Sequence, residues 1–365
     1  MTQVFDQLNL RGEEAAFREG FLNSALYDAL RKYHEDVADQ ATCYVSASSG
    51  FEDRDGTAAT ATTNGATTNS SSSSITSLDR LKIRFDIPWP LFPLVVTTKH
   101  LETYNLIFSS LLQVKRAKYN LDSLKLVELN IDADDVKQAL DAAKGGGGSA
   151  GVSLLKDSKG EFLSVDAIVA HMKHRVVIFR QKLLHFVNCL HNYIMLRILH
   201  VIQVDFQLKL EAAHEIENVD ELRQMHEIFL QQIWERCPLN PIFGNFRNLI
   251  LRLLNCCVTL QRRWRGPRTT MRAFAAAATA DENYDNLDAS VDSLDSLNSP
   301  PPTPASPLLS PTMVVVTEGL TPQNFGEMEH EMSQVISFSQ MFLSRVIKRG
   351  SFPHLKGFAL EMLPW

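Results

Sequence analysis

Apolar side chains recur at steps of three and four residues along one long stretch of the chain, from about residue 174 to residue 237. This stretch contains no glycine and no proline. Its apolar stripe consists of Val176, Phe179, Leu183, Phe186, Leu190, Ile194 and Ile198. Such spacing places the residues on one side of an α-helix, and that side must be buried against other helices. The pattern therefore predicts a long helix that begins near Ser164, a suitable N-cap, and ends at about His214.

The same spacing predicts further helices, which make the fold class all-α. They cover about residues 13–34, 99–119, 218–237, 246–264 and 325–349, followed by a short helix around residues 354–360. At the start of the helix over 218–237 we expect a capping box, in which Asn218 caps and Glu221 reaches back to it. Gly350 suits the position after the end of the helix over 325–349. The sequence predicts a helical bundle.

Two of these helices carry a stripe that we expect to be buried. In the first helix the stripe is Phe17, Phe21, Leu22, Leu26, Leu30 and Tyr33. In the helix over 99–119 it is Leu101, Tyr104, Phe108, Leu111 and Leu112. Both stripes predict that these helices share one interior with the long helix.

One short segment departs from the helical pattern. Leu81, Ile83, Phe85 and Ile87 alternate with charged residues, and a period of two predicts a short strand or extended segment. Pro88 and Pro90 end it, because each proline withholds a backbone donor and Pro90 disfavours helix at Trp89. The fold class is therefore an all-α helical bundle with one short extended segment and long disordered loop insertions.

Three polar segments cannot bury enough apolar surface to order themselves. Residues 48–78 are rich in serine, threonine and alanine, residues 144–151 form a glycine-rich linker, and residues 266–324 are rich in serine and proline. We predict one domain, formed by residues 1–265 and 325–365, that these loops interrupt. The last loop holds five Ser-Pro or Thr-Pro pairs, at Ser299, Thr303, Ser306, Ser310 and Thr321. They are candidates for phosphorylation, which adds about −1.5 to −2 charges per site, and the alternative is a plain spacer.

Composition narrows the classes of partner. The net charge of −6 is mild and argues against a nucleic-acid surface over the whole chain. Five cysteines, an odd number and scattered along the chain, favour a reducing compartment over a disulfide framework. The N-terminus lacks an apolar signal core, and no apolar run approaches the ~20 residues that a membrane span needs. We expect a cytosolic protein that binds neither nucleic acid nor membrane.

Candidate reaction chemistry is sparse. His171, His174, His185 and His191 lie on one predicted helix, but no carboxylate or thiolate is spaced to complete a metal site. The glycine-rich linker lacks the lysine that follows the glycines of a phosphate-binding loop. The adjacent Cys256 and Cys257 point about 100° apart on a helix, so a structural role is the default. We therefore expect no enzyme activity, no metal and no cofactor.

Two groups of residues could contact a partner. Trp89, between Pro88 and Pro90, is either an exposed anchor or a core residue that fixes the entry of the following helix. Arg262, Arg263 and Arg265 surround Trp264 and could face an acidic partner. Their alternative is a solvated helix end, where cations also complement the helix dipole.

Three stretches, in this order, resemble the family of gamma-tubulin complex components. The first is FDIPWPLFPLVVTTKHLETYNLIFSSLLQVK at residues 85–115. The second begins with LLHFVNCLHNYIMLRIL and ends with VDELRQMHEIFL, over residues 183–230, and the third is RGSFPHLKGFAL at residues 349–360. The matching region in that family is its C-terminal helical domain. Phe206 departs from the family pattern, since tryptophan is more common there, but one aromatic replaces another.

The resemblance implies a non-enzymatic domain that binds gamma-tubulin. Together with other gamma-tubulin complex components, such domains set gamma-tubulins side by side and template microtubule nucleation. It also implies a place in the cytoplasm, the cytoskeleton and the microtubule-organizing centre, at centrosome or spindle pole. The family's N-terminal domain, which makes lateral contacts between neighbours, has no counterpart in the sequence, and the two alternatives are a fragment and an incomplete gene model.

The alternative function is a helical tether or adaptor unrelated to tubulin. The two alternatives predict different structures. A gamma-tubulin-binding domain would have the segment at Pro88–Pro90 entering a helical bundle beside the long helix, whereas a tether would be an elongated rod of stacked helical repeats.

Overall fold

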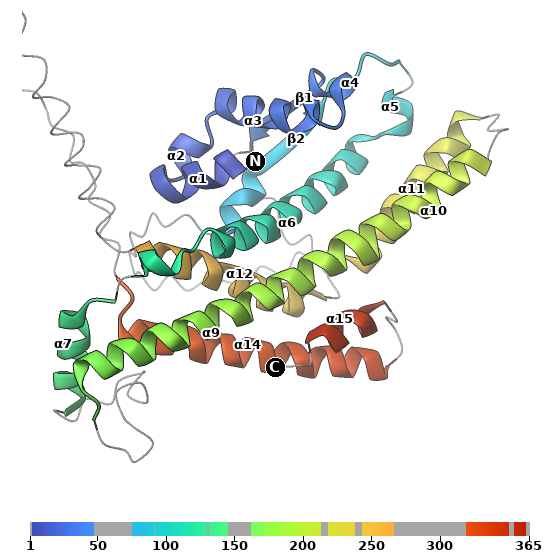
Figure 1. Cartoon of the computed structure of the whole chain (residues 1–365). Helices are drawn as coiled ribbons and strands as arrows, with labels where there is room; N and C mark the ends of the chain where they lie inside the picture. Colours follow the sequence, from blue (N-terminus) through green and yellow to red (C-terminus); the bar gives the residue numbers. More distant parts are fainter. Residues whose placement is uncertain are drawn as a thin grey trace, which may run out of the picture.

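A continuous helical column crosses the molecule, and the other long helices pack along it (Figure 1). The computed structural model describes residues 2–46, 75–90, 92–129, 131–144, 162–212, 218–237, 243–265, 319–349 and 354–362, and the structural statements below refer to these residues. The column consists of α9 (Val165–Asn192), the π-helical segment η3 (Tyr193–His200) and α10 (Val201–Ala212). Its predicted start is confirmed, because the Ser164 side chain accepts the N–H of Ala167 at 3.4 Å.

The predicted stripe of the column is buried throughout, from Val176 to Ile198. Around it pack α6 (Thr98–Asp122), α7 (Ala133–Lys144), α12 (Gly244–Arg265), α14 (Pro322–Lys348) and α15 (Leu355–Met362). Large side chains from several helices fill the shared core, and the rings of Phe179 and Phe325 meet edge to face at 5.4 Å. Burial of this many large apolar side chains is the main source of stability.

A smaller module covers one side of α6 (Figure 1). It consists of α1 (Thr2–Arg11), α2 (Glu13–Ala16), α3 (Glu19–Arg31), α4 (Glu35–Ala38), β1 (Ala41–Val45), the 3-10 helix η1 (Ile75–Arg80) and β2 (Leu81–Phe85). The two strands pair antiparallel, with Cys43 opposite Ile83. The module has its own apolar cluster, which includes Phe5, Leu22 and Leu26. The strand predicted over 81–87 is confirmed, and so is the all-α class, with this single two-stranded sheet among the described residues.

Three predictions about the module are wrong. The helix predicted over 13–34 breaks between Ala16 and Glu19, and Tyr33 is 72% exposed because it lies beyond the end of α3. The loop predicted over 48–78 ends earlier, since η1 begins at Ile75. The η1 helix is held by packing and by a hydrogen bond. Ile75 and Leu78 are fully buried, and the N–H of Ile75 donates to the Asn255 side chain at 2.9 Å.

The buried side of α6 also differs from the prediction. Of its predicted stripe, only Leu112 is fully buried, whereas a row of polar residues is buried: Asn105, Ser109, Gln113, Arg116 and Asn120. We call this row the polar seam of α6. Residues of α6 belong both to the main core and to the apolar cluster of the module. Several residues of the polar seam form hydrogen bonds with the module. Ser109 and Gln113 donate to Asp79, and Asn9 donates to the Asn120 side chain at 2.8 Å.

At the far end of the column, α10 pairs with α11 (Val219–Arg236), and α5 (Phe92–Val95) packs on α11 (Figure 1). The ring of Phe206 lies 4.6 Å from that of Phe229, so the aromatic that departs from the family pattern packs inside this pair. The capping box predicted at Asn218 is wrong, because its side chain makes no capping bond and only its carbonyl accepts the N–H of Glu221. Gly350 and most of 144–151 lie outside the described residues.

Candidate partner-binding surfaces

Trp89 lies in the turn between β2 and α5, and its side chain is 46% exposed. Pro88 and Pro90 beside it are exposed as well, and the carbonyl of Trp89 accepts the N–H of Phe92 at 3.0 Å to start α5. On α5 itself, Leu94 is also exposed. The interpretation of Trp89 as a core residue is therefore wrong. The turn presents an aromatic side chain to solvent, and α5 presents an aliphatic one.

The arginines near Trp264 take part in the packing of the fold. The indole of Trp264 is fully buried, and its Nε1 donates to the carbonyl of Lys125 at 3.0 Å. Arg263 is half-buried and donates to the carbonyl of Asn324 at 3.5 Å. Burial, and then the neighbouring Arg263, lowers the pKa of Arg262. The side chain of Arg265 lies outside the described residues. This geometry favours the helix-end interpretation over a free basic patch.

The two predicted groups lie far apart. Trp89 precedes the N-terminal end of α6, whereas Trp264 is hydrogen-bonded to Lys125, just past the C-terminal end of that helix (Figure 1). An α-helix rises 1.5 Å per residue, so the length of α6 separates them. The structure therefore offers two separate candidate surfaces and no single site.

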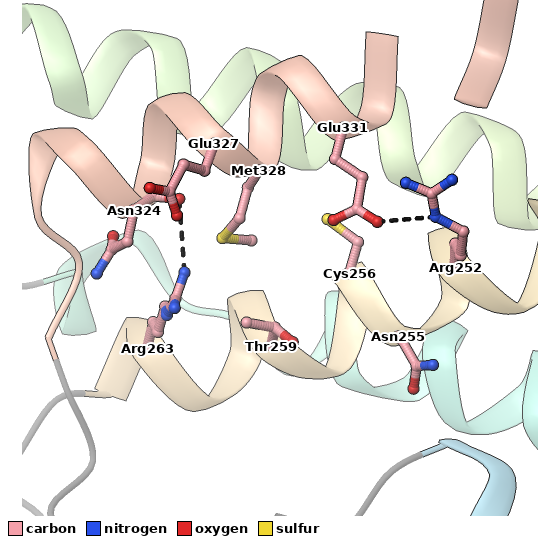
Figure 2. A pocket seen from close by; sticks show the side chains of 9 residues that line it. All are labelled: Arg252, Asn255, Cys256, Thr259, Arg263, Asn324, Glu327, Met328 and Glu331. Atoms are coloured by element: carbon pink, nitrogen blue, oxygen red, sulfur yellow. Dashed lines mark hydrogen bonds and ion pairs between the residues drawn. The ribbon is translucent and has the colours of Figure 1, made fainter. Parts of the chain in front are cut away.

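A polar groove of about 290 Å³ runs between α12 and α14 (Figure 2). Its walls are Arg252, Asn255, Cys256, Thr259 and Arg263 from α12, and Asn324, Glu327, Met328 and Glu331 from α14. An ion pair between Arg252 and Glu331, 3.0 Å from Nε to Oε1, bridges one end. Because Asn255 already accepts the N–H of Ile75, part of the polar lining serves the fold.

The thiols near these helices are poor nucleophiles. Burial raises the pKa of Cys256 to about 12 and that of Cys257 well above its usual value. Cys189 lies 3.4 Å from Nε2 of His185, but burial, and then Glu361, raises its pKa too. Since the thiolate is the reactive form, burial disfavours nucleophilic chemistry at these three cysteines.

The described part of the chain shows neither a metal site nor a membrane span. Among these residues, no group of three or more His, Cys, Asp and Glu side chains could hold a metal ion. None of the helices there is both long and apolar enough to cross a membrane.

Of the predicted phosphorylation sites, only Thr321 lies within the described residues. Thr321 is the N-cap of α14. Its Oγ1 accepts the N–H of Asn324, and in return Oδ1 of Asn324 accepts the backbone N–H of Thr321 at 3.0 Å. The loop predicted over 266–324 therefore ends before this cap. Ser299, Thr303, Ser306 and Ser310 lie outside the described residues.

The sequence did not reveal the exposed apolar face of α10. Val201, Val204 and Leu208 are exposed there, and Ile202 is the one fully buried residue of this helix. The sequence VIQVDFQLKL at residues 201–210 places apolar residues on every side of a helix, and this pattern could have indicated an exposed apolar face. Only the position of α10 beyond the bundle shows which of these residues meet solvent.

Comparison with known proteins adds a second line of observation. A family model described as the C-terminal part of gamma tubulin complex components matches residues 1–347. Two proteins named gamma-tubulin complex component 5, from Macaca fascicularis and Mus musculus, are each 26% identical to the chain over 363 residues, which is 99% of its length. The chain spans 38% of the first relative and 27% of the second.

Proposed function

Because the chain belongs to the gamma-tubulin complex component family, with a match over residues 1–347, we propose that it is a non-catalytic, gamma-tubulin-binding subunit of the gamma-tubulin complex. The observation that supports this most directly is the match of nearly the whole chain to the family's C-terminal part. Both relatives are named gamma-tubulin complex components, and gamma-tubulin would be the partner of this chain as well.

The architecture also favours this function over a tether. The turn at Pro88–Pro90 precedes α5 and then α6, and α6 packs along α9 within one core. In an elongated rod of stacked repeats each repeat contacts only its neighbours along the chain, whereas here α14 packs on α7, α9 and α12. Helices packed around one core would hold a bound partner in a fixed orientation, which a templating subunit requires.

The proposed mechanism is preorganisation. Each copy would hold one gamma-tubulin, and an array formed with other gamma-tubulin complex components would set several of them side by side. Free subunits lose translational and rotational entropy when a microtubule nucleus forms, and the array would reduce this entropic cost. The subunit would act in the cytoplasm, at a microtubule-organizing centre such as the centrosome or spindle pole.

For the contact with gamma-tubulin we propose the turn at Pro88, Trp89 and Pro90 together with Leu94. Tryptophan is among the residue types most enriched at binding hot spots, and Trp89 is exposed without a demand of the core; Leu94, on the following α5, adds exposed apolar surface. Arg262, Arg263 and Arg265 stay a second predicted contact, weakened by the half-burial of Arg262 and Arg263.

The experiment is a pull-down of purified gamma-tubulin on the immobilised full chain. We expect stoichiometric capture, and a loss of about tenfold or more in affinity for Trp89→Ala, as expected of a hot spot. Tyr33→Ala is the control, since this aromatic is exposed on the module. Failure of the unmodified chain to retain gamma-tubulin contradicts the proposed function, and equal binding by Trp89→Ala contradicts only the proposed contact.

A further inference from the structure

A row of cations runs along the junction of α6 and α9, two long helices that pack side by side (Figure 1). On α6 the cations are Lys115 and Lys118, one turn apart, and on α9 they are Arg180 and His191. Nε of Arg180 donates to the carbonyl of Leu121 at 2.9 Å, which places this guanidinium at the C-terminal end of α6. Burial, and then Lys118, lowers the pKa of His191, and Lys115 acts in the same direction, so both lysines lie near this imidazole. We call these four residues the basic strip.

The charge of the basic strip is not balanced by the rest of the fold. Lys115 is exposed and Lys118 is half-buried, and within the described ranges no carboxylate pairs with either lysine or with Arg180. Asp122 is the one carboxylate on the same stripe of α6. From Ala167 to His200, along α9 and η3, the sequence holds no aspartate and no glutamate. Cations gathered without countercharges repel one another, so an acidic occupant would stabilise this surface.

Apolar side chains border the basic strip. Leu111 and Leu184 are half-buried on the same stripes of α6 and α9 as the cations. Just past α6, Leu126 and Val127 are exposed next to the exposed Lys125, and Val127 is 97% exposed. A fitting occupant therefore carries carboxylates and apolar side chains along one short stretch.

The chain contains such a stretch at residues 281–297, DENYDNLDASVDSLDSL, which we call the acidic segment. It lies outside the described residues, and it holds six carboxylates and neither lysine nor arginine. Two sets of its residues recur at steps of three and four, the carboxylates at Asp281, Asp285, Asp288, Asp292 and Asp295 and the apolar side chains at Tyr284, Leu287, Val291 and Leu294. On a helix, this spacing gives an acidic stripe beside an apolar one.

The described parts of the chain on either side of the acidic segment meet near the basic strip. α12 ends one residue after Trp264, whose Nε1 donates to the carbonyl of Lys125, just past α6, at 3.0 Å. The start of α14 lies at the same place, because Arg263 donates to the carbonyl of Asn324 at 3.5 Å (Figure 1). The insertion that carries the acidic segment therefore leaves and re-enters the fold at the C-terminal end of α6.

The acidic segment can reach the basic strip. Fifteen residues, 266–280, connect it to α12, and an extended chain of this length spans up to about 50 Å. From Lys115 to its end at Asp122, α6 rises only about 10 Å. A tether of this kind gives an effective concentration of roughly 1 mM, so even a weak contact is formed in most molecules.

We propose that the acidic segment docks on the basic strip of its own chain. Its carboxylates would face Lys115, Lys118 and Arg180, and its apolar side chains would cover Leu111 and Leu184. The contact keeps other acidic surfaces from the basic strip and holds the insertion on the α6–α9 side of the domain. It weakens with salt, because exposed charge pairs are screened. The docking goes beyond the binding of gamma-tubulin and does not require it.

Zero-length cross-linking of the full chain tests the contact directly. At low salt a carbodiimide joins a carboxylate to a lysine amine without a spacer, and mass spectrometry identifies the joined peptides. We expect the acidic segment to be joined to Lys115 or Lys118, with a yield that does not change on dilution. Lys99, exposed in the first turn of α6, is the internal control and should be joined about tenfold less often. Absence of the link overturns the proposal, and a yield that rises with protein concentration overturns it by assigning the occupant to another copy.

A labelled peptide of residues 281–297 supplies a second measurement, by fluorescence anisotropy. The receiving protein is the full chain with all six carboxylates of its acidic segment changed to amides, so that its own segment no longer competes. Lys115→Glu together with Lys118→Glu should weaken peptide binding about tenfold. Lys99→Glu is the matched control and should leave the affinity unchanged, and circular dichroism checks the fold of each variant.

The unmodified chain should bind the peptide about tenfold more weakly than the amide variant, because its own segment occupies the basic strip. Equal affinity of these two proteins overturns the proposal, as does equal affinity of the Lys115→Glu, Lys118→Glu variant. Equal binding of a scrambled peptide of the same composition overturns it too, since the basic strip would then accept any acidic chain. None of these outcomes touches gamma-tubulin binding, which the pull-down measures separately.

Discussion

Asn105 on α6 binds both backbone hydrogen-bonding groups of Ile83 on β2. Its Oδ1 accepts the N–H of Ile83 at 2.7 Å, and its Nδ2 donates to the carbonyl of Ile83 at 3.1 Å. The side-chain amide thus takes the place of a third strand along the free edge of the sheet. On the other edge, the Asn23 side chain accepts the N–H of Cys43 at 2.6 Å. A two-stranded sheet is marginal alone, and these amides join it to helices.

Asn105→Ala should therefore loosen the module from α6. It leaves two backbone groups of Ile83 without their partner, which costs about 1–3 kcal/mol of unfolding free energy. Urea unfolding monitored by circular dichroism measures the loss. Asn248→Ala, at an exposed position on α12, is the matched control and should change stability by less than about 0.5 kcal/mol. Equal values for the two variants would contradict the role of Asn105.

The two tryptophans near the predicted contacts should respond in opposite ways to truncation. Trp264 is fully buried and hydrogen-bonded, so Trp264→Ala should cost about 3–5 kcal/mol of unfolding free energy. Trp89 is exposed, so Trp89→Ala should cost less than about 0.5 kcal/mol while it weakens partner binding. Thermal unfolding of both variants tests this contrast, and a large loss for Trp89→Ala would show that the indole belongs to the core.

Thr321 begins α14, and its role as a cap is open to direct measurement. Thr321→Ala removes the acceptor for the N–H of Asn324 and should destabilise the protein by about 1 kcal/mol. Thr321→Ser keeps the hydroxyl and should retain most of the stability. Urea unfolding compares the two. If alanine and serine behave alike, the hydroxyl does not stabilise the helix.

Gly357 on α15 lies against the guanidinium of Arg197, which pairs with Glu361 at 3.0 Å. A Cβ at this position would come within 2.6 Å of Nη1 of Arg197, so the arginine must move and its exposed ion pair breaks. Alanine gains about 0.8–1 kcal/mol over glycine in a helix, and an exposed ion pair contributes about 0–1 kcal/mol. The two effects should nearly cancel in Gly357→Ala.

A double-mutant cycle separates the two effects. In an Arg197→Ala background no guanidinium has to move, and Gly357→Ala should then stabilise the protein by close to the full helix-propensity gain of about 0.8–1 kcal/mol. Thermal unfolding of the four proteins measures the coupling. Equal effects of Gly357→Ala in both backgrounds would mean that Arg197 and Gly357 do not interact.

Stability should fall in mild acid because of His226. His226 is buried, and its Nε2 lies 2.8 Å from the hydroxyl oxygen of Tyr104. The centroid of its ring is 4.8 Å from that of His100. Burial, and then His100, lowers its pKa in the folded state. As pH falls below the unfolded value of about 6.5, the unfolded chain binds this proton first, so unfolding becomes more favourable.

His226→Gln is the variant that tests this dependence, because glutamine can still bond to Tyr104 but does not titrate. Between pH 7.5 and pH 5.5 the unmodified protein should lose more unfolding free energy than the variant does. Burial also lowers the pKa values of His191 and His354, so part of the loss should persist in the variant. Identical losses in both proteins would exclude His226 as a cause.

The local sequence predicted the long helices well, because helical periodicity is a property of neighbouring residues. The column, its N-cap at Ser164 and its stripe from Val176 to Ile198 follow from spacing alone. The family also followed from local motifs and is confirmed by the match over residues 1–347. Among its members, the ending at residues 349–360 most resembles component 5, which is the name of the two relatives.

What the sequence left open depended on contacts between distant residues. The partner of β2 is a strand about forty residues earlier in the chain, and the stripe predicted for α6 was misleading because this helix is covered on two sides. The hydrogen bond between Asn9 and Asn120 joins residues 111 positions apart, and no local sequence pattern predicts it.

The sequence by itself thus determined which segments are helical, the family, and the expectation that the chain binds a partner instead of catalysing a reaction. The tertiary structure alone decided that Trp89 is exposed and Trp264 is buried, and that they lie at opposite ends of α6. The physical reason is that burial depends on which helices pack together, and a helix pattern states only that one side must be covered.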